Sequence, residues 1–490
     1  MVKAMRRSAV LAGLGALGLF FLSTPVVAEV QNVRVGGDVT VRAFHRENLD
    51  LHQEDQVSAV TSLDDEDDFL MQTTAVNIGA DLTENVSATL RVVNERDWDS
   101  TVANSAAGAG DIELSQAYVT LKELFYAPLT LRIGTQPIVW GRGFVLGSNL
   151  FPSVNTMGND RNAAISANEF TDLTSFDAIR ATLDLAGVAG LPLTVDGVYI
   201  KLDENVFSTP DDVNLMGVNV GTRVDAMNTE LEAYYVNKRD KNTDVLLAAS
   251  RNDGSVSTVG VRGSAQPMHG SSVWGELAYQ FGRRNIDPAA ILPSGDAQQA
   301  WGVNLGLNYT LAEVSTSPTF GAEWRFYSGK DVQGAVNGWA PMAPGYFTTA
   351  LREFQTGTSV AGFYGNDQVC YVNGAATGDD CTASGSNQHE LAVFASFKPL
   401  EDLTIAPRLS WFILDVGAIP TSTTASAAAA DRLSKRKHYA GMEWDTMMTY
   451  NYTDDVQLGV IYALFLPGNV YRSPNDSTAQ ELVSSVSVKF

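Results

Sequence analysis

Repeated alternation of apolar and polar residues is the feature that most constrains how this sequence can fold. Between residues 32 and 46, Val33, Val35, Val39 and Val41 occupy odd positions, and the even positions are mostly polar. Side chains of a β-strand point in turn to its two faces, so this stretch predicts a strand with one apolar and one polar face. A sheet built of such strands separates an apolar medium from a polar one.

The same alternation recurs along the chain and predicts eighteen strands. They span residues 32–46, 70–82, 86–97, 112–124, 127–139, 174–187, 191–204, 211–225, 227–238, 254–266, 271–284, 297–312, 316–328, 387–399, 402–416, 436–452, 455–468 and 479–490. Short links fall at 83–85, 125–126, 188–190, 226, 267–270, 313–315, 400–401 and 453–454. The other links are mostly long and rich in Gly, Ser, Asn and Asp, and the two kinds alternate without exception.

Alternating short and long links are typical of outer-membrane barrels, which have short periplasmic turns and longer extracellular loops. Beyond the N-terminal segment no stretch approaches eighteen consecutive apolar residues, so a membrane-spanning helix is not expected. An even number of strands can close the sheet and remove its edges. The sequence therefore predicts an all-β fold, a transmembrane antiparallel β-barrel of 18 strands with both termini periplasmic and with long extracellular loops at 47–69, 140–173 and 329–386.

The N-terminus has the pattern of a secretory signal peptide. Basic residues at positions 3, 6 and 7 precede an apolar run, and the segment ends in small residues at Ala28. We expect residues 1–28 to be removed after Sec-type export. Residues 29–490 should then form a single transmembrane β-barrel domain in the outer membrane of a Gram-negative cell.

Composition and charge restrict the possible partners. Hydrophobic residues make up 45% of the chain and charged residues 18%, as in folded proteins. The formal net charge is -23, and removal of the three basic residues of the signal peptide takes it to -26. A surface this negative is poorly suited to the phosphates of nucleic acid, so we expect no nucleic-acid partner.

Eighteen tilted strands enclose more space than side chains can fill, which predicts a water-filled lumen. The residues expected to line this pore or to bind its solute are Arg34, Arg42, Arg91, Arg132, Arg142, Arg180, Arg223, Arg262, Arg325, Arg408, Glu276 and Glu323. A planar guanidinium group can bind a carboxylate with two hydrogen bonds, so arginines on many strands favour an anionic solute. The alternative is that each arginine pairs with a carboxylate of the wall and stiffens the barrel.

The apolar faces of the strands should contact lipid. We expect Val259, Val261, Leu305 and Leu307 to face hydrocarbon. The neighbouring Asn304 should face the lumen and tolerate a larger side chain there. Aromatic residues near several strand ends favour an interfacial girdle.

Loop 140–173 begins with the glycine-rich and apolar sequence WGRGFVL, which is unsuited to a solvated loop tip. We expect this loop to fold inward and to narrow the lumen. Folding inward would bring Arg142 towards Arg132 and Arg180, which lie on the two flanking strands.

Cys370 and Cys381 both lie in loop 329–386, and in an exported protein this pair predicts a disulfide. The five histidines show no HExxH spacing, and no GxSxG motif is present. We therefore expect no enzyme activity, no metal and no cofactor. The alternative is a hydrolase at the barrel rim that uses His45 or His389.

Three stretches, 113–151, 175–185 and 323–331, resemble the alginate-export family of outer-membrane porins. In that family a strand reading roughly AYV-L is followed by PL-LR-G-Q, by a glycine-rich start of a long loop, and by FDA-R. The matching residues are Ala117, Tyr118, Val119, Leu121, Pro128, Leu129, Leu131, Arg132, Gly134, Gln136, Trp140, Gly141, Gly143, Phe176, Asp177, Ala178 and Arg180. The resemblance implies an 18-stranded, monomeric barrel, with an arginine-rich conduit in members that export an anionic polysaccharide.

The sequence thus predicts a passive outer-membrane channel for anionic or polar solutes or polysaccharide. The alternative is an adhesin, or a scaffold for a periplasmic partner, whose lumen is plugged. Expected partners are the solute, outer-membrane lipid with lipopolysaccharide, and the barrel-assembly machinery, because a last strand ending in Phe490 resembles the signature that this machinery reads. The acidic loop 47–69 either binds divalent cations or is simply solvated.

Overall fold

The computed structural model describes a defined part of the chain. Its residues are 32–49, 51, 56–57, 62–63, 66–98, 112–148, 166–203, 212–240, 254–284, 296–329, 338–353, 386–418, 437–471 and 476–490. The predicted signal peptide, residues 1–28, and the predicted disulfide between Cys370 and Cys381 lie outside these residues.

Eighteen strands form one antiparallel sheet, and they match the predicted segments to within a few residues. They are β1 (Asn32–Glu47), β4 (Glu66–Thr83), β5 (Val86–Asp97), β6 (Glu113–Leu121), β7 (Leu129–Gln136), β8 (Phe176–Asp184), β9 (Leu193–Asp203), β10 (Val213–Val224), β11 (Thr229–Asp240), β12 (Gly254–Ala265), β13 (Ser271–Arg284), β14 (Asp296–Thr310), β15 (Thr319–Tyr327), β16 (Gln388–Leu400), β17 (Leu403–Ala418), β18 (Lys437–Asn451), β19 (Val456–Pro467) and β20 (Ala479–Lys489). Two further strands, β2 (Gln56–Val57) and β3 (Ser62–Leu63), form a separate small sheet.

Short helical turns shorten several strands relative to the prediction. They are η2 (Leu124–Tyr126) after β6, α2 (Ala186–Ala189) after β8 and η5 (Ala226–Asn228) after β10. Glu123, two residues after the end of β6, has a positive φ of 51°, and Phe125 and Tyr126 of η2 follow with 57° and 59°, so the extended conformation does not continue. The predicted strand 112–124 therefore stops three residues early, at Leu121.

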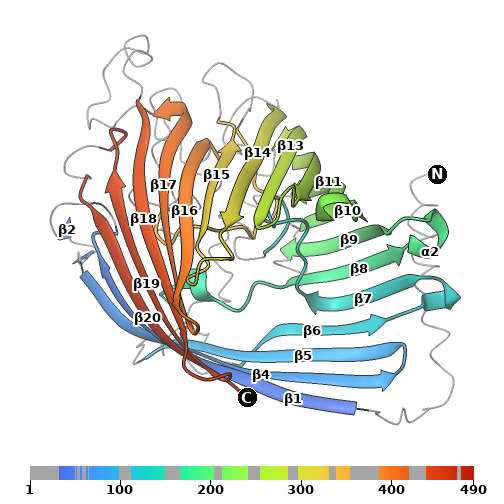
Figure 1. The fold of residues 1–490 in the computed structure, drawn as a ribbon. Helices are drawn as coiled ribbons and strands as arrows, with labels where there is room; N and C mark the ends of the chain where they lie inside the picture. Colours follow the sequence, from blue (N-terminus) through green and yellow to red (C-terminus); the bar gives the residue numbers. More distant parts are fainter. Residues whose placement is uncertain are drawn as a thin grey trace.

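The sheet closes on itself. Each barrel strand pairs antiparallel with the next one along the chain, and β20 pairs with β1, for example Val486 with Val41 and Lys489 with Asp38. Figure 1 shows the strands following one another around the barrel, with the C-terminus beside β1. The all-β, 18-stranded antiparallel barrel expected from the alternation is confirmed.

The two faces of the wall differ as the alternation requires. Leu305, Leu307 and Val261 point outward and are 46%, 53% and 55% exposed.

No helix in the described part of the chain is both long and apolar enough to span a bilayer.

Asn304 points inward, as expected, but neighbouring side chains fill the space around it. Its side chain is only 1% exposed, accepts a hydrogen bond from Trp274 Nε1 (2.9 Å) and donates one to Glu323 Oε1 (2.7 Å). The reason is that the Trp274 ring lies across the inward face of the next strand, where a Cβ on Gly306 would meet it at 2.1 Å.

The connections divide the barrel into two ends. We call the end with the short links the turn side and the end with the long links the loop side. The first residue of β1 pairs with Asp81, next to the β4–β5 turn, and β20 ends beside the β18–β19 turn, where Lys489 N donates to Asp455 O. Both ends of the barrel strand order therefore lie on the turn side.

Candidate functional site

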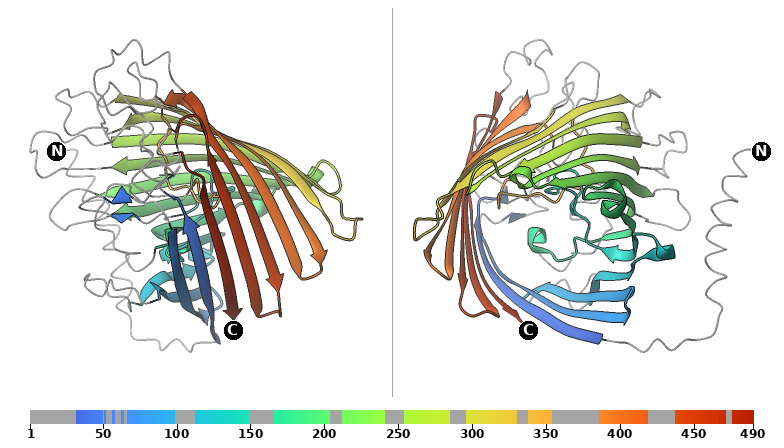
Figure 2. Two further views of the ribbon diagram at one scale, coloured as in Figure 1. Left: turned by 90° about the vertical axis from the view of Figure 1, so that its left-hand side faces the viewer. Right: turned by 45° about the vertical axis from the view of Figure 1, so that its right-hand side comes forward.

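Three segments of the long loops lie inside the barrel on its loop side. We call them the inner segments 138–148, 166–173 and 338–353, the second of which contains η4 (Asn168–Phe170). Figure 2 (right) shows parts of the chain inside the ring of strands, among them the green segment 166–173. The lumen, with these segments and the wall side chains that hold them, is the candidate functional site.

Inner segment 138–148 runs along the inward face of the barrel wall from β9 to β15. Trp140 Nε1 donates to Asp196 Oδ2 on β9 (2.8 Å). Phe144 stacks on Tyr327 of β15 at 5.0 Å between ring centroids. The segment shares a buried apolar cluster with inward residues of strands β8 to β15. Apolar side chains cover this part of the wall, so the apolar start of the loop is buried against them. The prediction that the loop folds inward is confirmed for these residues.

Inner segment 338–353 continues around the wall to β18. Side-chain amides on two strands hold its start: Gln298 Nε2 donates to Gly338 O (2.7 Å), and Ala340 N donates to Gln280 Oε1 (2.8 Å). At its end, Leu351 N and Arg352 N donate to the carboxylate of Glu443 on β18 at 2.7 and 2.9 Å. The wall therefore supplies hydrogen-bond partners for backbone N–H and C=O groups of this segment.

Inner segment 166–173 lies against β1, β4, β5 and β6. Ser166 N donates to Asp97 Oδ2 and Asp172 N donates to Glu95 Oε1, each at 2.7 Å. Glu169 pairs with Arg46 of β1, and burial raises the pKa of the Glu169 carboxyl. Carboxylates of the wall thus hold backbone amides of this segment, as they do in segment 338–353.

Most of the predicted pore arginines pair with carboxylates. Seven of the ten do so: Arg34 with Asp81 (3.3 Å), Arg91 with Asp38 (2.8 Å) and Asp172 (2.6 Å), Arg180 with Asp196 (2.8 Å), Arg223 with Glu230, Arg262 with Glu232 (2.5 Å), Arg325 with Glu353 (2.8 Å) and Glu390, and Arg408 with Glu390 (2.8 Å) and Glu323 (3.2 Å). For these side chains the structure has the arrangement given above as the alternative, in which arginine stiffens the wall.

Three predicted pore arginines have no described carboxylate within ion-pair distance, and aromatic rings hold them instead. Arg132 lies 4.7 Å above the Tyr118 ring, and Arg42 lies 5.0 Å above the Phe170 ring. Arg142 lies between two rings, 4.2 Å from Trp274 and 4.8 Å from Tyr346, and also donates to the Tyr346 hydroxyl (2.6 Å). We call these three the ring-held arginines.

Of the predicted grouping of Arg142 with Arg132 and Arg180, only part forms: Arg132 and Arg180 are opposite each other on β7 and β8, and Arg142 lies elsewhere. Arg142 contacts β13 and inner segment 338–353, whereas Arg132 contacts β6 and Arg180 pairs with Asp196 on β9. The reason is that Trp140 docks on β9 and the segment then continues along the wall, away from β7 and β8.

The two predicted pore carboxylates lie in the same region. Glu276 is buried, accepts a hydrogen bond from the Tyr234 hydroxyl (2.7 Å), and has its second oxygen buried without a hydrogen bond. Glu323 accepts hydrogen bonds from Asn304 (2.7 Å) and from the Tyr346 hydroxyl (3.2 Å). Glu323 therefore helps to fix inner segment 338–353, whereas the hydrogen bond to Glu276 comes from the wall.

The role of several side chains in holding the inner segments to the wall was not predicted, although Glu443 and Asp445 were expected to face the lumen. These side chains are chiefly Gln280, Gln298, Glu443, Asp445 and Arg352. One signal was available: on the loop-side half of β9, inward Val198, Ile200 and Leu202 are apolar although they face the lumen. Apolar residues on an inward face indicate that something apolar covers them.

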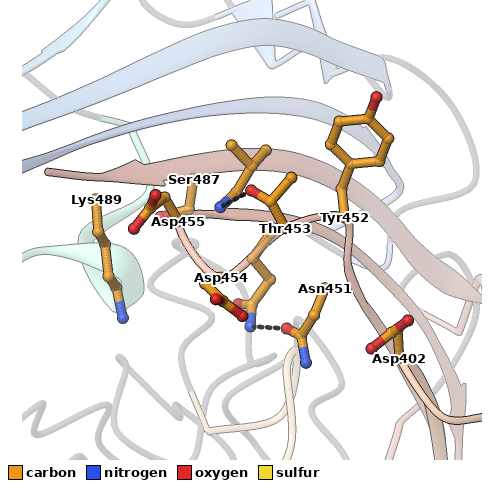
Figure 3. Close-up of a pocket in the computed structure, with 10 residues that line it drawn as sticks. Asp402, Asn451, Tyr452, Thr453, Asp454, Asp455, Ser487 and Lys489 are labelled. Carbon is orange, nitrogen blue, oxygen red and sulfur yellow. Dashed lines mark hydrogen bonds between the residues drawn. The ribbon is translucent and has the colours of Figure 1, made fainter.

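The turn-side mouth is polar. Figure 3 shows a hollow between the β18–β19 turn and the ends of β17 and β20, where Gln457 donates to Asn451 Oδ1 (2.9 Å). Asp402, Ser487 and Lys489 also line it.

One group among the described residues could hold a metal ion. His45, Glu66 and Asp68 place one ligand atom each within 4.8 Å of one another. His45 precedes Arg46, whose side chain points into the barrel, so the His45 side chain points outward. His45 is opposite Asp68 of β4, and the group therefore lies on the outside of the barrel, at the loop-side rim.

Comparison with solved structures identifies the same fold in outer-membrane porins. OccK9 (OpdG) of Pseudomonas aeruginosa matches with a TM-score of 0.55 and 11% identity, over 94% of this chain and 99% of that chain. OccAB2 of Acinetobacter baumannii has a TM-score of 0.52 and 10% identity over 94% and 99%. A BenF-like porin from Pseudomonas fluorescens Pf-5 has a TM-score of 0.50 and 11% identity over 94% and 100%.

No curated protein sequence matches this chain. The model of the alginate-export family, in contrast, matches residues 39–485, which span the barrel from β1 to β20. The resemblance inferred from the sequence motifs is therefore confirmed, and the chain belongs to the alginate-export family.

Proposed function

We propose that the chain forms a passive outer-membrane channel for anionic or polar solutes. Membership of the alginate-export family and the porin fold support a channel. The single observation that carries the preference for anions is the set of ring-held arginines, Arg42, Arg132 and Arg142, which form no ion pair with a described carboxylate. Carboxylates act on two of them from a greater distance: Asp38, Glu95, Glu169 and Asp172 on Arg42, and Glu276 on Arg142.

A ring behind a guanidinium group holds its position without occupying all of its N–H groups. The edge of the guanidinium can then donate two parallel hydrogen bonds to a carboxylate that passes through the lumen. An arginine that already pairs with aspartate or glutamate attracts a passing anion less strongly, because its positive charge is compensated. The ring-held arginines therefore provide local sites for an anion in a chain whose net charge is negative.

The proposal includes orientation and partners. The turn side faces the periplasm, the loop side faces the medium, and outer-membrane lipid and lipopolysaccharide surround the wall. Phe490 ends the barrel, and its backbone exchanges hydrogen bonds with Gly37 of β1 at 2.8 and 3.0 Å, with its side chain 72% exposed. This exposed end suits recognition by the barrel-assembly machinery. The proposal also includes a monomer, as the resemblance to the alginate-export family implies.

Conductance and ion selectivity in planar bilayers test the proposal. The wild-type protein should give discrete conductance steps with a reversal potential that indicates anion preference. Arg132→Glu should shift the reversal potential towards cations, because it reverses the charge above Tyr118. Arg132→Lys retains the positive charge and is the matched control. An unchanged reversal potential in Arg132→Glu would show that Arg132 lies away from the ion path.

One observation favours the alternative, a barrel with a plugged lumen that serves as an adhesin or scaffold. The three inner segments together contact strands on most of the loop-side wall. In that case the purified barrel would give no conductance steps in the same measurement, and no arginine variant would change ion flow.

A further inference from the structure

We infer that inner segments 138–148 and 338–353 form a single fixed crossbar, joined by glycines, and that this junction sets the size limit of the channel. The inference rests on the proposed channel function and adds the residues that determine which solutes are small enough to pass. We call Gly143, Gly147 and Gly345 the glycine seam.

Backbone hydrogen bonds join the two segments directly. Gly345 N donates to Gly143 O (2.8 Å), Gly147 N donates to Ala343 O (2.8 Å), and Ala343 N donates to Val145 O (3.1 Å). Leu146 and Ala343 form a parallel β-bridge at the centre. The two segments come from loops about 200 residues apart in the sequence, yet they pair as neighbouring strands do.

The seam requires glycine because the two backbones touch. A Cβ on Gly345 would lie 2.4 Å from the carbonyl carbon of Gly147, and a Cβ on Gly147 would lie 3.0 Å from the Cα and the N of Gly345. Gly143 also has φ of 81°, a conformation that L side chains rarely adopt. Even alanine would therefore force the segments apart.

Both ends of the crossbar are anchored to the wall. One end is held where Trp140 binds Asp196 on β9, and the other where Leu351 and Arg352 bind Glu443 on β18. Between the anchors, Phe144, Leu146 and Trp339 are at most 2% exposed. Moving one segment would expose this cluster and break the backbone hydrogen bonds, so the crossbar is a fixed part of the wall.

A side-chain contact crosses the same junction. Arg142 belongs to the first segment, and Tyr346, which accepts its hydrogen bond, belongs to the second. The crossbar covers β9 to β18, so solutes pass between it and the opposite wall, where segment 166–173 covers β1, β4 and β5. Separating the seam would release the two segments from their fixed positions and would widen this passage.

The first experiment compares two glycine-to-alanine variants. Gly345→Ala should raise single-channel conductance about twofold or more and admit larger neutral sugars in liposome-swelling assays, because the pore dimensions limit permeation. Gly187→Ala is the matched control, since a Cβ at Gly187 would meet no atom within 4 Å, and it should behave as wild type. Equal conductance and equal sugar cut-off in all three proteins would overturn the inference.

The second experiment locks the seam. Leu146→Cys with Ala343→Cys, made with Cys370→Ser and Cys381→Ser, should form a disulfide across the β-bridge. A fixed crossbar predicts that oxidation leaves conductance and solute cut-off unchanged. If oxidation blocks solutes that pass under reducing conditions, the seam opens during transport, and the inference of a fixed crossbar is wrong.

The outcomes separate this inference from the proposed function. A wild-type barrel without conductance contradicts the proposed channel. If the wild type does not conduct but Gly345→Ala does, the seam still limits passage through the lumen, as part of a plug. A conducting wild type with an unaltered Gly345→Ala variant contradicts only the role of the seam.

Discussion

The two halves of the lumen are built in different ways although the same strands form both. On the loop side the inward face carries apolar residues and buried ion pairs, and the inner segments cover it. On the turn side the inward face is polar, with exposed ion pairs such as that of Arg223 and with hydroxyl pairs such as Thr310 and Thr319, whose hydroxyls lie 2.8 Å apart. Thr40 and Ser487 form another such pair, at 2.9 Å. One alternating wall can thus serve as a core at one end and as a wet surface at the other.

The difference shows that a barrel lumen does not have to be polar throughout. Where loops fold inward, the inward face obeys the rules of a protein core, with apolar packing and partners for buried charges. Where no loop covers it, the inward face obeys the rules of a surface. Substitutions on the inward face should therefore have unequal effects in the two halves.

The largest effect is expected for Arg325→Ala on the loop side. Arg325 is 2% exposed and pairs with Glu353 and Glu390, so its loss leaves buried carboxylates without a main partner, although Arg408 still reaches Glu390. We expect the free energy of unfolding to fall by about 3 to 5 kcal/mol. Urea titration of the barrel refolded in lipid vesicles measures it.

The matched control is Arg223→Ala on the turn side. Arg223 pairs with Glu230, but its side chain is 62% exposed, so the loss should stay below about 1 kcal/mol. Equal losses at the two arginines would show that the halves do not differ in burial.

The outward face should be sensitive to a charge even where the inward face is a polar surface. Leu305→Arg and Leu307→Arg should each lower the free energy of unfolding by about 2 to 4 kcal/mol, because both place a charge in hydrocarbon. The same urea titration applies, with Asn308→Arg as the inward control on the same strand, which should cost far less. A mild effect at both leucines would contradict a lipid-facing surface on β14.

Two asparagines on β14 compare the halves most closely, because they share a strand and a face. Asn304→Ala removes the acceptor for Trp274 Nε1 and a donor to Glu323, both buried, and should cost about 2 to 3 kcal/mol. Asn308→Ala, nearer the turn side and half-buried, should change stability by less than about 0.5 kcal/mol. Thermal unfolding in detergent is sufficient to compare them, and a reversed order would contradict the division of the lumen.

The smallest effect is expected for Trp140→Phe. This change keeps an aromatic ring, a smaller one, but removes the 2.8 Å hydrogen bond to Asp196, which Arg180 also binds. We expect a loss of about 1 kcal/mol, seen as faster cleavage of loop 140–173 by protease. Trp301→Phe, on the outward face, should leave the cleavage rate unchanged, and a change there would indicate a general loosening of the barrel.

The strands could be predicted from the sequence because each depends on a local pattern. Alternation over ten residues is sufficient to place β14 or β19, whatever the rest of the chain does. Bounds were less accurate where a turn adopted a helical conformation, as after Leu121, because residues 122–126 contain no glycine or proline that would mark the turn.

The path of the inner segments could not be predicted from such patterns. Trp140 and Asp196, or Gly143 and Gly345, meet because the barrel brings distant residues together, and nothing next to either residue in the sequence indicates its partner. The same limit explains why Arg142 was placed near Arg132: proximity in the sequence was the available guide. The pairing of most arginines with carboxylates also depended on register between strands, which alternation alone does not fix.

The pairing of β1 with β20 has a consequence for the order of assembly. Thr40 and Ser487, which share a hydrogen bond, are 447 residues apart in the sequence, and this contact joins the two edges of the sheet. Until β20 arrives, β1 and the most recently added strand both present unpaired backbone groups, which hydrocarbon does not tolerate. Membrane insertion and closure must therefore be completed together, and a chain that lacks β20 should be recognised in the cell as unfinished, whatever the quality of its other seventeen strands.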